Sequence, residues 1–273
     1  MIGLLHPGQM GAAIGAQLTA AGQEVLWCTA GRGERTRRRA EQAGLRGVDT
    51  LAELLAGSEV VLSVCPPAAA EEVALRVAEA GFAGVYVDAN AISPHRMVRI
   101  GERLGSVVDG SIIGPPPGPG THARVYLSGP GAVVRRVRAL FEGGHARAVA
   151  LSERIGDASA LKMAYGSYNK ASHALAAVSH ALAERYGVGE ALRAEAAVDG
   201  SSALAKTHRL PSVAARAWRW APELLEAAES FAAVGLPPEL ATGAAAVFDR
   251  LAADKDDQDL SVEDVLRHLA GHD

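Results

Sequence analysis

Short apolar runs alternate with helical patterns through the first half of the chain. We expect strands at residues 2–5, 24–28, 48–50, 59–67, 84–90, 105–114 and 123–129, with a first helix of small residues at about 10–21. Most of these runs are continuously apolar, which fits strands that are buried on both faces. Strands that alternate with helices favour an α/β fold with a parallel, doubly wound sheet of the Rossmann type.

The pattern changes after about residue 150, where no further strand is expected. Residues 157–187 predict one long helix, with Asp157 as its N-cap and Gly187 as its stop. The remainder is rich in alanine and predicts an all-helical domain, with breaks at Gly200, Pro211, Pro222 and Pro237-Pro238. We therefore expect a dinucleotide-binding domain at 1–152 and a helical substrate and dimerisation domain at 153–273. The long helix exceeds what its own domain can bury, so we expect it to pack against a second copy in a homodimer.

Length, charge and cysteine content limit the number of domains, the partners and the location that we expect. A length of 273 residues suits two domains, and no apolar run approaches the roughly 20 residues of a membrane span. The net charge of -4 does not indicate nucleic acid or an anionic membrane as a partner. Two cysteines and a first strand starting at Ile2, which leaves no room for a signal peptide, predict a cytoplasmic location. Three histidines are scattered and predict no metal site: His173, His180 and His208.

The stretch "HPGQMG" follows the first strand and opens the first helix. A dinucleotide fingerprint has the spacing G-x-G-x-x-G, and here only its second and third glycines, Gly8 and Gly11, are present. The amides at the helix N-terminus could still hold a pyrophosphate. The predicted cofactor contacts of this loop are His6, Pro7, Gly8, Gln9, Met10 and Gly11. Whether His6 touches the cofactor or only fills space stays open.

The second strand indicates which nicotinamide cofactor is bound. It ends in "WCTAGRGER", with no carboxylate before Glu34 to bind the ribose hydroxyls of NAD. Thr29 and Arg32 would instead receive a 2′-phosphate, which predicts NADP. Further contacts are expected where the next strands end, at Cys65, Pro66 and Asn90. Pro66 could equally begin a helix, and Cys65 is better explained as a buried filler than as a nucleophile.

A polar stripe on the long helix carries the candidate chemistry. Helical spacing places Lys162, Tyr165, Asn169 and His173 on one face of an otherwise apolar segment. A partly buried lysine gives up its proton more easily, so Lys162 is the predicted general acid and base. The alternative is a lysine that reaches solvent.

Several motifs in order resemble the β-hydroxyacid dehydrogenase superfamily, which includes 6-phosphogluconate and 3-hydroxyisobutyrate dehydrogenases. They are "IGLLHPGQMG", "VDANAISP", "VDGSIIGPP" and "GDASALKMAYG", and the resemblance covers the whole chain. It is nearest to a bacterial phosphogluconate-dehydrogenase-like branch with a distinct C-terminal helical domain. The resemblance implies an NADP-binding Rossmann domain, a swapped helical dimer and Lys162 as general acid and base.

The chain departs from this superfamily at substrate-binding positions. The substrate-binding serine falls at Ile113, and the helix asparagine that follows the lysine falls at Gly166. Replacement contacts to a small-molecule substrate are predicted from Ser111, Gly114, Asn169 and Trp220, and Tyr165 is predicted to donate or orient a proton. Trp220 could equally be a core or dimer residue.

Three functions remain open from the sequence. The first is an NADPH-dependent oxidoreductase that transfers hydride to or from a small carbonyl or hydroxy compound. The second is an imine reductase acting on C=N bonds, although relatives of that kind usually lack the lysine at the position of Lys162. The third is a non-catalytic NADPH-binding sensor or scaffold.

Overall fold

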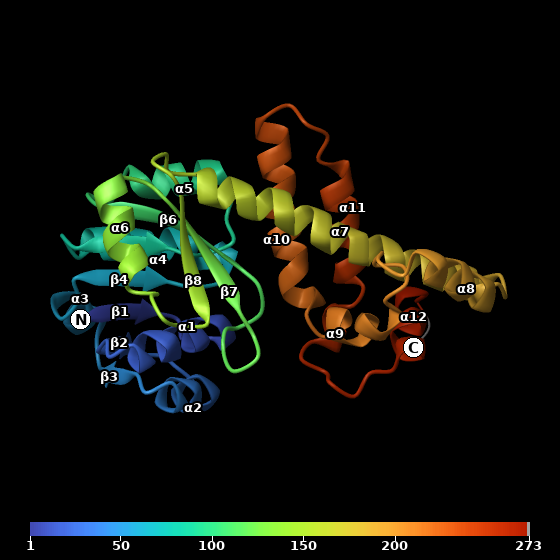
Figure 1. Cartoon of the computed structure of the whole chain (residues 1–273), viewed down its shortest axis with the longest axis horizontal. Coiled ribbons are helices and arrows are strands. Elements are labelled where there is room, and N and C mark those ends of the chain that lie inside the picture. Colours follow the sequence, from blue (N-terminus) through green and yellow to red (C-terminus); the bar gives the residue numbers. More distant parts are fainter. Residues whose placement is uncertain (272–273) are drawn as a thin grey trace. The chain divides into compact units, whose positions relative to one another are not determined.

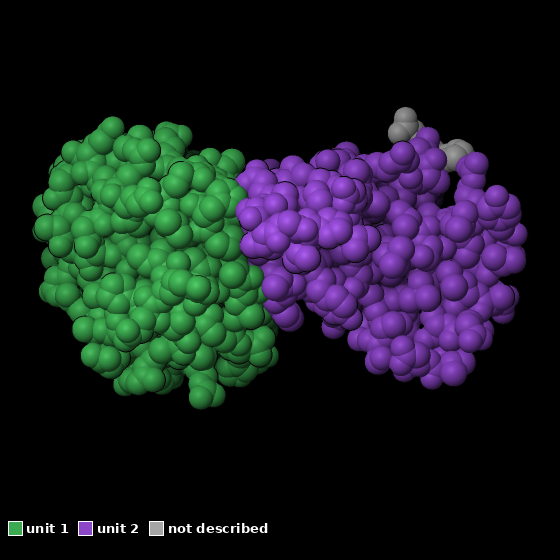
Figure 2. All heavy atoms as spheres, turned by 90° about the horizontal axis from the view of Figure 1, so that it is seen from above, with its two compact units in different colours: residues 1–162 green, residues 163–273 purple. Residues whose placement is uncertain are grey.

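The computed structural model describes residues 1–271 and divides into two compact units (Figures 1 and 2). The first unit comprises residues 1–162 and the second residues 163–273. The division falls inside the long helix α7 (Asp157–Arg185), whereas the predicted domain boundary lies before this helix. No helix among the described residues is long and apolar enough to cross a membrane.

The first unit is a sheet of eight strands with helices, which confirms the α/β fold of the Rossmann type that the sequence predicts. The strand order is β3-β2-β1-β4-β5-β6-β7-β8, and every pairing is parallel except β6 with β7. The strands are β1 (Ile2–Leu5), β2 (Val25–Cys28), β3 (Arg46–Val48), β4 (Val60–Ser63), β5 (Val85–Asp88), β6 (Val107–Ile113), β7 (Ala123–Ser128) and β8 (Ala146–Ser152). The helices are α1 (Gln9–Ala20), α2 (Glu34–Gln42), α3 (Leu51–Ala56), η1 (Pro67–Ala69), α4 (Ala70–Glu79), α5 (Pro94–Gly101) and α6 (Gly131–Ala139).

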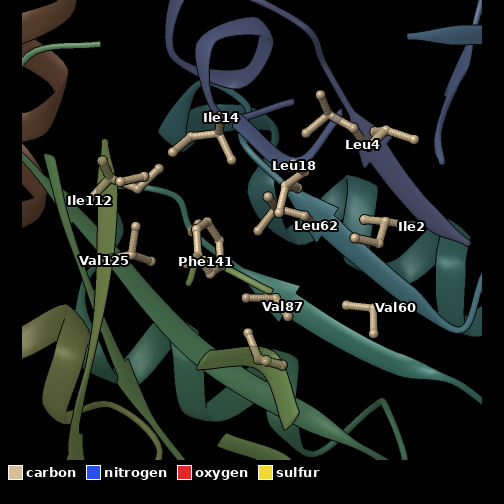
Figure 3. Packing of buried hydrophobic residues seen from close by; sticks show 14 of the residues in the cluster. Ile2, Leu4, Ile14, Leu18, Val60, Leu62, Val87, Ile112, Val125 and Phe141 are labelled. Atoms are coloured by element: carbon tan, nitrogen blue, oxygen red, sulfur yellow. The ribbon is translucent and has the colours of Figure 1, made fainter. Parts of the chain in front are cut away.

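The central strands are buried on both faces. Neighbouring residues of one strand enter different cores: Leu4 packs in one hydrophobic cluster and Leu5 in the other. Figure 3 shows the first cluster, in which Ile14 and Leu18 of α1 lie beside strand residues such as Leu62. Burying each such side chain contributes about 1.5–3 kcal/mol, so continuous apolar runs are what these strands require.

The sequence-based assignment of strands needs two corrections. The sequence analysis did not predict strand β8, because six of its seven residues are exposed or half-exposed and it lies at the sheet edge. The third strand ends at Val48 instead of beginning there, and it too is an edge strand with exposed residues. Edge strands carry a weaker hydrophobic pattern, since only one side is paired and covered.

The second unit is all-helical, as predicted. After α7 the chain forms α8 (Gly189–Asp199), η2 (Thr207–Arg209), α9 (Leu210–Ala214), α10 (Ala217–Ala233), α11 (Glu239–Asp249), η3 (Ala252–Asp254) and α12 (Val262–Leu269). Gly200 ends α8 in a left-handed conformation with φ 64°. Pro222 does not break the chain as expected but lies inside α10, near its start, where the missing N–H removes a single helical hydrogen bond. Asp157 is the first residue of α7 and not its N-cap.

Candidate functional site

The turn after β1 keeps a tight conformation without the first fingerprint glycine. His6 adopts a left-handed backbone with φ 66°, a region that glycine favours and that histidine enters more readily than most residues. The N–H of Gly8 donates to the carbonyl oxygen of His6 at 2.8 Å, and Gly8 then caps α1 with no side-chain acceptor. No side chain caps the first N–H groups of α1, so these groups can donate to a pyrophosphate.

The two remaining glycines serve different purposes. A Cβ at Gly11 would overlap the carbonyl oxygen of His6, so α1 can approach the loop only with glycine there. A Cβ at Gly8 would meet no described atom within 4 Å. The space over Gly8 is thus open to a ligand, and the loop fits the second and third roles of the fingerprint.

The His6 side chain is a neutral, half-buried group beside this loop. Its Nδ1 is buried and has no hydrogen-bond partner among the described residues. Burial lowers the pKa of His6 to about 4, and the nearby charges of Arg32 and Arg76 act in the same direction. The imidazole therefore stays uncharged at neutral pH. The predicted cofactor residue Arg32 lies close enough to His6 for its positive charge to lower the pKa of the imidazole.

The turn after β2 is held by an arginine that the sequence analysis did not single out. Arg37 donates to the carbonyl oxygens of Thr29 and Arg32, both at 3.1 Å, and the N–H of Arg32 bonds the Thr29 carbonyl at 3.2 Å. Glu34, the first carboxylate after the strand, forms an ion pair with Arg38 at 3.3 Å. The turn therefore presents the half-buried Thr29 and Arg32 with no carboxylate between them.

Asn90 braces the ends of β4 and β5. Its side-chain carbonyl accepts from the N–H of Cys65 at 2.5 Å, and its amide donates to Ser63 Oγ at 3.2 Å and Asp88 Oδ2 at 2.9 Å. Burial raises the pKa of Asp88 to about 7, although its hydrogen bonds from Asn90 oppose this shift. The network fixes the backbone where predicted cofactor contacts lie. Pro66 is exposed and immediately precedes η1, so the helix-start explanation also fits it.

The thiol of Cys65 has no features of a nucleophile. It is buried, and burial raises its pKa to about 11. A thiol needs a lowered pKa to react at neutral pH, so the filler interpretation from the sequence fits the structure.

A buried carboxylate anchors the start of α7 on the sheet. Asp109 of β6 accepts from the N–H groups of Gly156 and Ser159, each at 3.0 Å, and from the hydroxyls of Ser128 and Ser159 at 3.0 and 2.8 Å. Burial raises its pKa despite these bonds. The sequence analysis missed this anchor, which sets the position of the helix turn that follows it.

Lys162 lies one turn beyond that anchor. Its Nζ donates to the carbonyl oxygen of Ile112 at 2.6 Å. Asp88, the last residue of β5, pairs with Asp109, so β6 runs on to Ile112 beyond the end of its neighbour. The ammonium group is therefore held at the carboxyl edge of the parallel strands, where ligands of doubly wound sheets bind.

The two predicted substrate residues on and after β6 differ in setting. Ser111 is fully buried and its hydroxyl has no partner among the described residues, so its contact with substrate stays a prediction. Gly114 has φ 128°, and a Cβ there would lie 2.7 Å from the carbonyl oxygen of His122. The backbone conformation and the close approach of His122 are enough to require glycine at position 114, without any contact to substrate.

The other predicted site residues belong to the second unit. Tyr165 and Asn169 are exposed on α7. Trp220 is half-buried in the helical unit, with its ring centroid 6.0 Å from that of His173 and 5.4 Å from that of Phe248, and with the Arg216 guanidinium 5.1 Å from its ring. These packing contacts are enough to explain a tryptophan at position 220. The proposed contacts of Tyr165, Asn169 and Trp220 with substrate stay predictions. Within residues 1–271, no group of three potential metal ligands is gathered.

Two segments of the chain match known protein families. Residues 1–91 match the family described as NADP oxidoreductase coenzyme F420-dependent, and residues 183–251 match a domain of unknown function, DUF1932. A curated relative from Methanothermus fervidus, described as an uncharacterized 28.5 kDa protein in the 7S RNA 5′ region, is 28% identical over 179 residues. That match covers 60% of this chain and 64% of the relative, so it spans less than two thirds of the relative's length.

Solved structures agree over nearly the whole length. A conserved protein of unknown function, described as structurally similar to 3-hydroxyacid dehydrogenases, is 27% identical with a TM-score of 0.67 over 93% of this chain and 97% of that one. The 3-hydroxyisobutyrate dehydrogenase of Mycobacterium tuberculosis shares the fold with a TM-score of 0.76 at 20% identity over 98% of both chains. An imine reductase from Streptomyces aurantiacus shares it with a TM-score of 0.51 at 20% identity, over 97% of this chain and 98% of that one.

The chain is therefore similar to an NADP oxidoreductase family over residues 1–91 and to DUF1932 over residues 183–251. The neighbour at 27% identity is described as similar to 3-hydroxyacid dehydrogenases, and a 3-hydroxyisobutyrate dehydrogenase shares the fold; both agree with the superfamily that the sequence resembles.

Proposed function

We propose that the protein is an NADPH-dependent oxidoreductase acting on a small carbonyl or hydroxy compound, with Lys162 as general acid and base. The observation that carries the proposal is the 2.6 Å bond that holds Lys162 Nζ on the Ile112 carbonyl at the carboxyl edge of the sheet. The loop from His6 to Gly11 opens at the same edge, since β1 and β5 run parallel within one sheet.

The chain's own residues fit a bound nicotinamide dinucleotide. The open backbone at Gly8 would receive the pyrophosphate on the α1 amides, and Thr29 with Arg32 would receive the 2′-phosphate. When bound, the cofactor supplies or accepts the hydride. In the reductive direction Lys162 donates a proton from Nζ to the substrate oxygen as negative charge develops there, and in the oxidative direction the neutral amine takes that proton back.

Cofactor choice can be tested at Arg32. Because a charge-assisted bond to a phosphate is worth about 1.5–3 kcal/mol, Arg32→Gln should weaken NADPH binding by about 10- to 100-fold and leave NADH binding unchanged. Fluorescence titration of both nucleotides measures this. Arg38→Gln, which removes an exposed arginine paired with Glu34, is the matched control and should change neither affinity. Equal weakening of both nucleotides by Arg32→Gln would contradict a 2′-phosphate contact.

We also propose that the protein works as a homodimer in which α7 contacts a second copy. Tyr168, Leu175 and Leu182 follow one another at seven-residue intervals along α7 and are 77%, 67% and 60% exposed. An apolar seven-residue spacing is the pattern of helices that pack together along their length. A second copy of the chain carries the same apolar stripe, so the two α7 helices can cover each other's exposed apolar residues in a symmetric dimer.

Dimer formation can be tested by placing charge in this stripe. The double variant Leu175→Glu/Leu182→Glu should elute as a folded monomer, because two carboxylates cannot be buried unpaired in a helix interface. Size-exclusion chromatography with light scattering measures the mass. Val198→Glu introduces the same charge at an exposed apolar residue of α8 and should leave the dimer intact. A monomeric unmodified chain, or a dimeric double variant, would overturn the proposal.

A further inference from the structure

A cavity of about 640 Å³ lies in the first unit. The residues that line it lie around the starts of β7 and β8 and the end of α6, elements that are labelled in Figure 1. Its lining carries three arginines and two histidines against one carboxylate: Arg124, Arg138, Arg147, His122, His145 and Glu142. This volume lies within the range of small-molecule sites. None of these residues takes part in the proposed hydride transfer.

The three guanidinium groups lack anionic partners in the structure. Within the described part of the chain, the side chains of Arg124, Arg138 and Arg147 form no hydrogen bond or ion pair, and all three are exposed. Arg136, from the same helix as Arg138, instead pairs with Glu59. The cavity thus collects cationic groups that the protein itself does not neutralise, and their summed field attracts an anion.

Strand register places two of these arginines side by side. Arg124 and Arg147 are direct partners across the parallel strands β7 and β8, so their side chains leave the sheet on the same face next to each other. Like charges at directly opposed positions destabilise a sheet. A ligand with several anionic oxygens can contact both neighbouring guanidinium groups at once.

The floor and rim of the cavity are built from fixed backbone. The N–H of His145 donates to Gln17 Oε1 of α1 at 2.7 Å, and its carbonyl oxygen accepts from the N–H of Ala123 at 3.0 Å. The His122 and His145 rings lie 5.2 Å apart at 49°. The strand pairing and these bonds hold the backbone that carries the arginines and histidines.

We propose that this cavity binds a small molecule that carries two or more negative charges, of the phosphorylated metabolite class. Arginine forks bind phosphate oxygens two at a time, and adjacent guanidinium groups suit a ligand with several such oxygens. The bound anion would relieve the repulsion between Arg124 and Arg147.

Inorganic pyrophosphate is a suitable probe for the full-length protein without cofactor, measured by calorimetric titration and thermal unfolding at low ionic strength. We expect saturable binding and a raised melting temperature, beyond the effect of sodium chloride at equal ionic strength. The variant Arg124→Gln/Arg147→Gln should weaken pyrophosphate binding at least about tenfold while the free protein melts at the same or a higher temperature. The matched control Arg135→Gln, an exposed arginine of α6 outside the cavity, should bind as the unmodified chain does.

Two results would overturn the proposal. One is a pyrophosphate response no larger than that of sodium chloride. The other is a response that survives in Arg124→Gln/Arg147→Gln and disappears in Gly8→Ala, because the anion would then bind at the loop that opens α1. Both results concern pyrophosphate binding and not turnover of a substrate. The test of this anion site is therefore independent of the test of the proposed oxidoreductase activity.

Discussion

Replacing Lys162 with alanine is expected to lower kcat by about 100- to 10,000-fold, the usual contribution of a positioned general acid. The affinity for NADPH should stay within about twofold, because the residue is proposed to act on the substrate oxygen and not on the cofactor. Oxidation of NADPH is followed with a panel of small aldehydes, ketones and 3-oxo acids, and with cyclic imines. The oxidative direction uses 3-hydroxy acids with NADP.

Lys162→Arg separates proton transfer from charge. Arginine keeps the positive charge at this position, but its guanidinium does not release a proton at working pH, so this variant should remain nearly as slow as Lys162→Ala. Full activity in Lys162→Arg would contradict the acid–base role of Lys162. The positive charge at this position would then act only by binding the substrate electrostatically. Turnover of imines alone, at a rate that Lys162→Ala leaves unchanged, would favour the imine reductase alternative. NADPH binding without turnover of any substrate would favour the sensor.

The second large effect is expected at the glycines of the α1 loop. Gly11→Ala should destabilise the protein by about 1–3 kcal/mol, because its methyl group overlaps the His6 carbonyl and forces α1 away from the loop. Gly8→Ala should leave the free energy of unfolding nearly unchanged and yet weaken NADPH binding at least about tenfold, since its methyl group fills the space over the α1 amides. Denaturant unfolding and nucleotide titration measure the two effects separately.

Gly105→Ala is the matched control for this pair. It adds a methyl group where no described atom lies within 4 Å, on the connection before β6. It should change neither stability nor affinity appreciably. If Gly8→Ala binds NADPH as tightly as Gly105→Ala does, the pyrophosphate does not lie on this loop.

Much of the fold could be predicted because it depends on local pattern. Buried parallel strands need continuous apolar runs, and β1, β4 and β5 have them. Strand β8 could not be predicted in this way, because residues such as Arg147 and Leu151 are exposed at the edge. The position of Pro222 inside α10 was also not predictable, since a proline pattern alone does not distinguish the start of a helix from its end.

Residues of the candidate site could be predicted only where a known sequence spacing marks them, as in the glycine fingerprint and the polar stripe of a helix. The positions of Gly8 and Gly11 follow from the fingerprint, and Lys162 follows from a helical stripe. The left-handed backbone of His6 is set by the tight turn that Gly8 and Gly11 close around it, so the residue type alone does not reveal it. The support of α7 by Asp109 depends on residues about fifty positions apart along the chain, which no local pattern links.

The most direct test of the central claim is titration of the full-length protein with NADPH and NADH, followed by the fluorescence of the bound nicotinamide. We expect saturable binding of NADPH that is at least about tenfold tighter than that of NADH, with Gly8→Ala impaired for both. Failure of both nucleotides to bind would contradict the assignment of this chain as a nicotinamide-dependent oxidoreductase, whatever the conformation of its α1 loop.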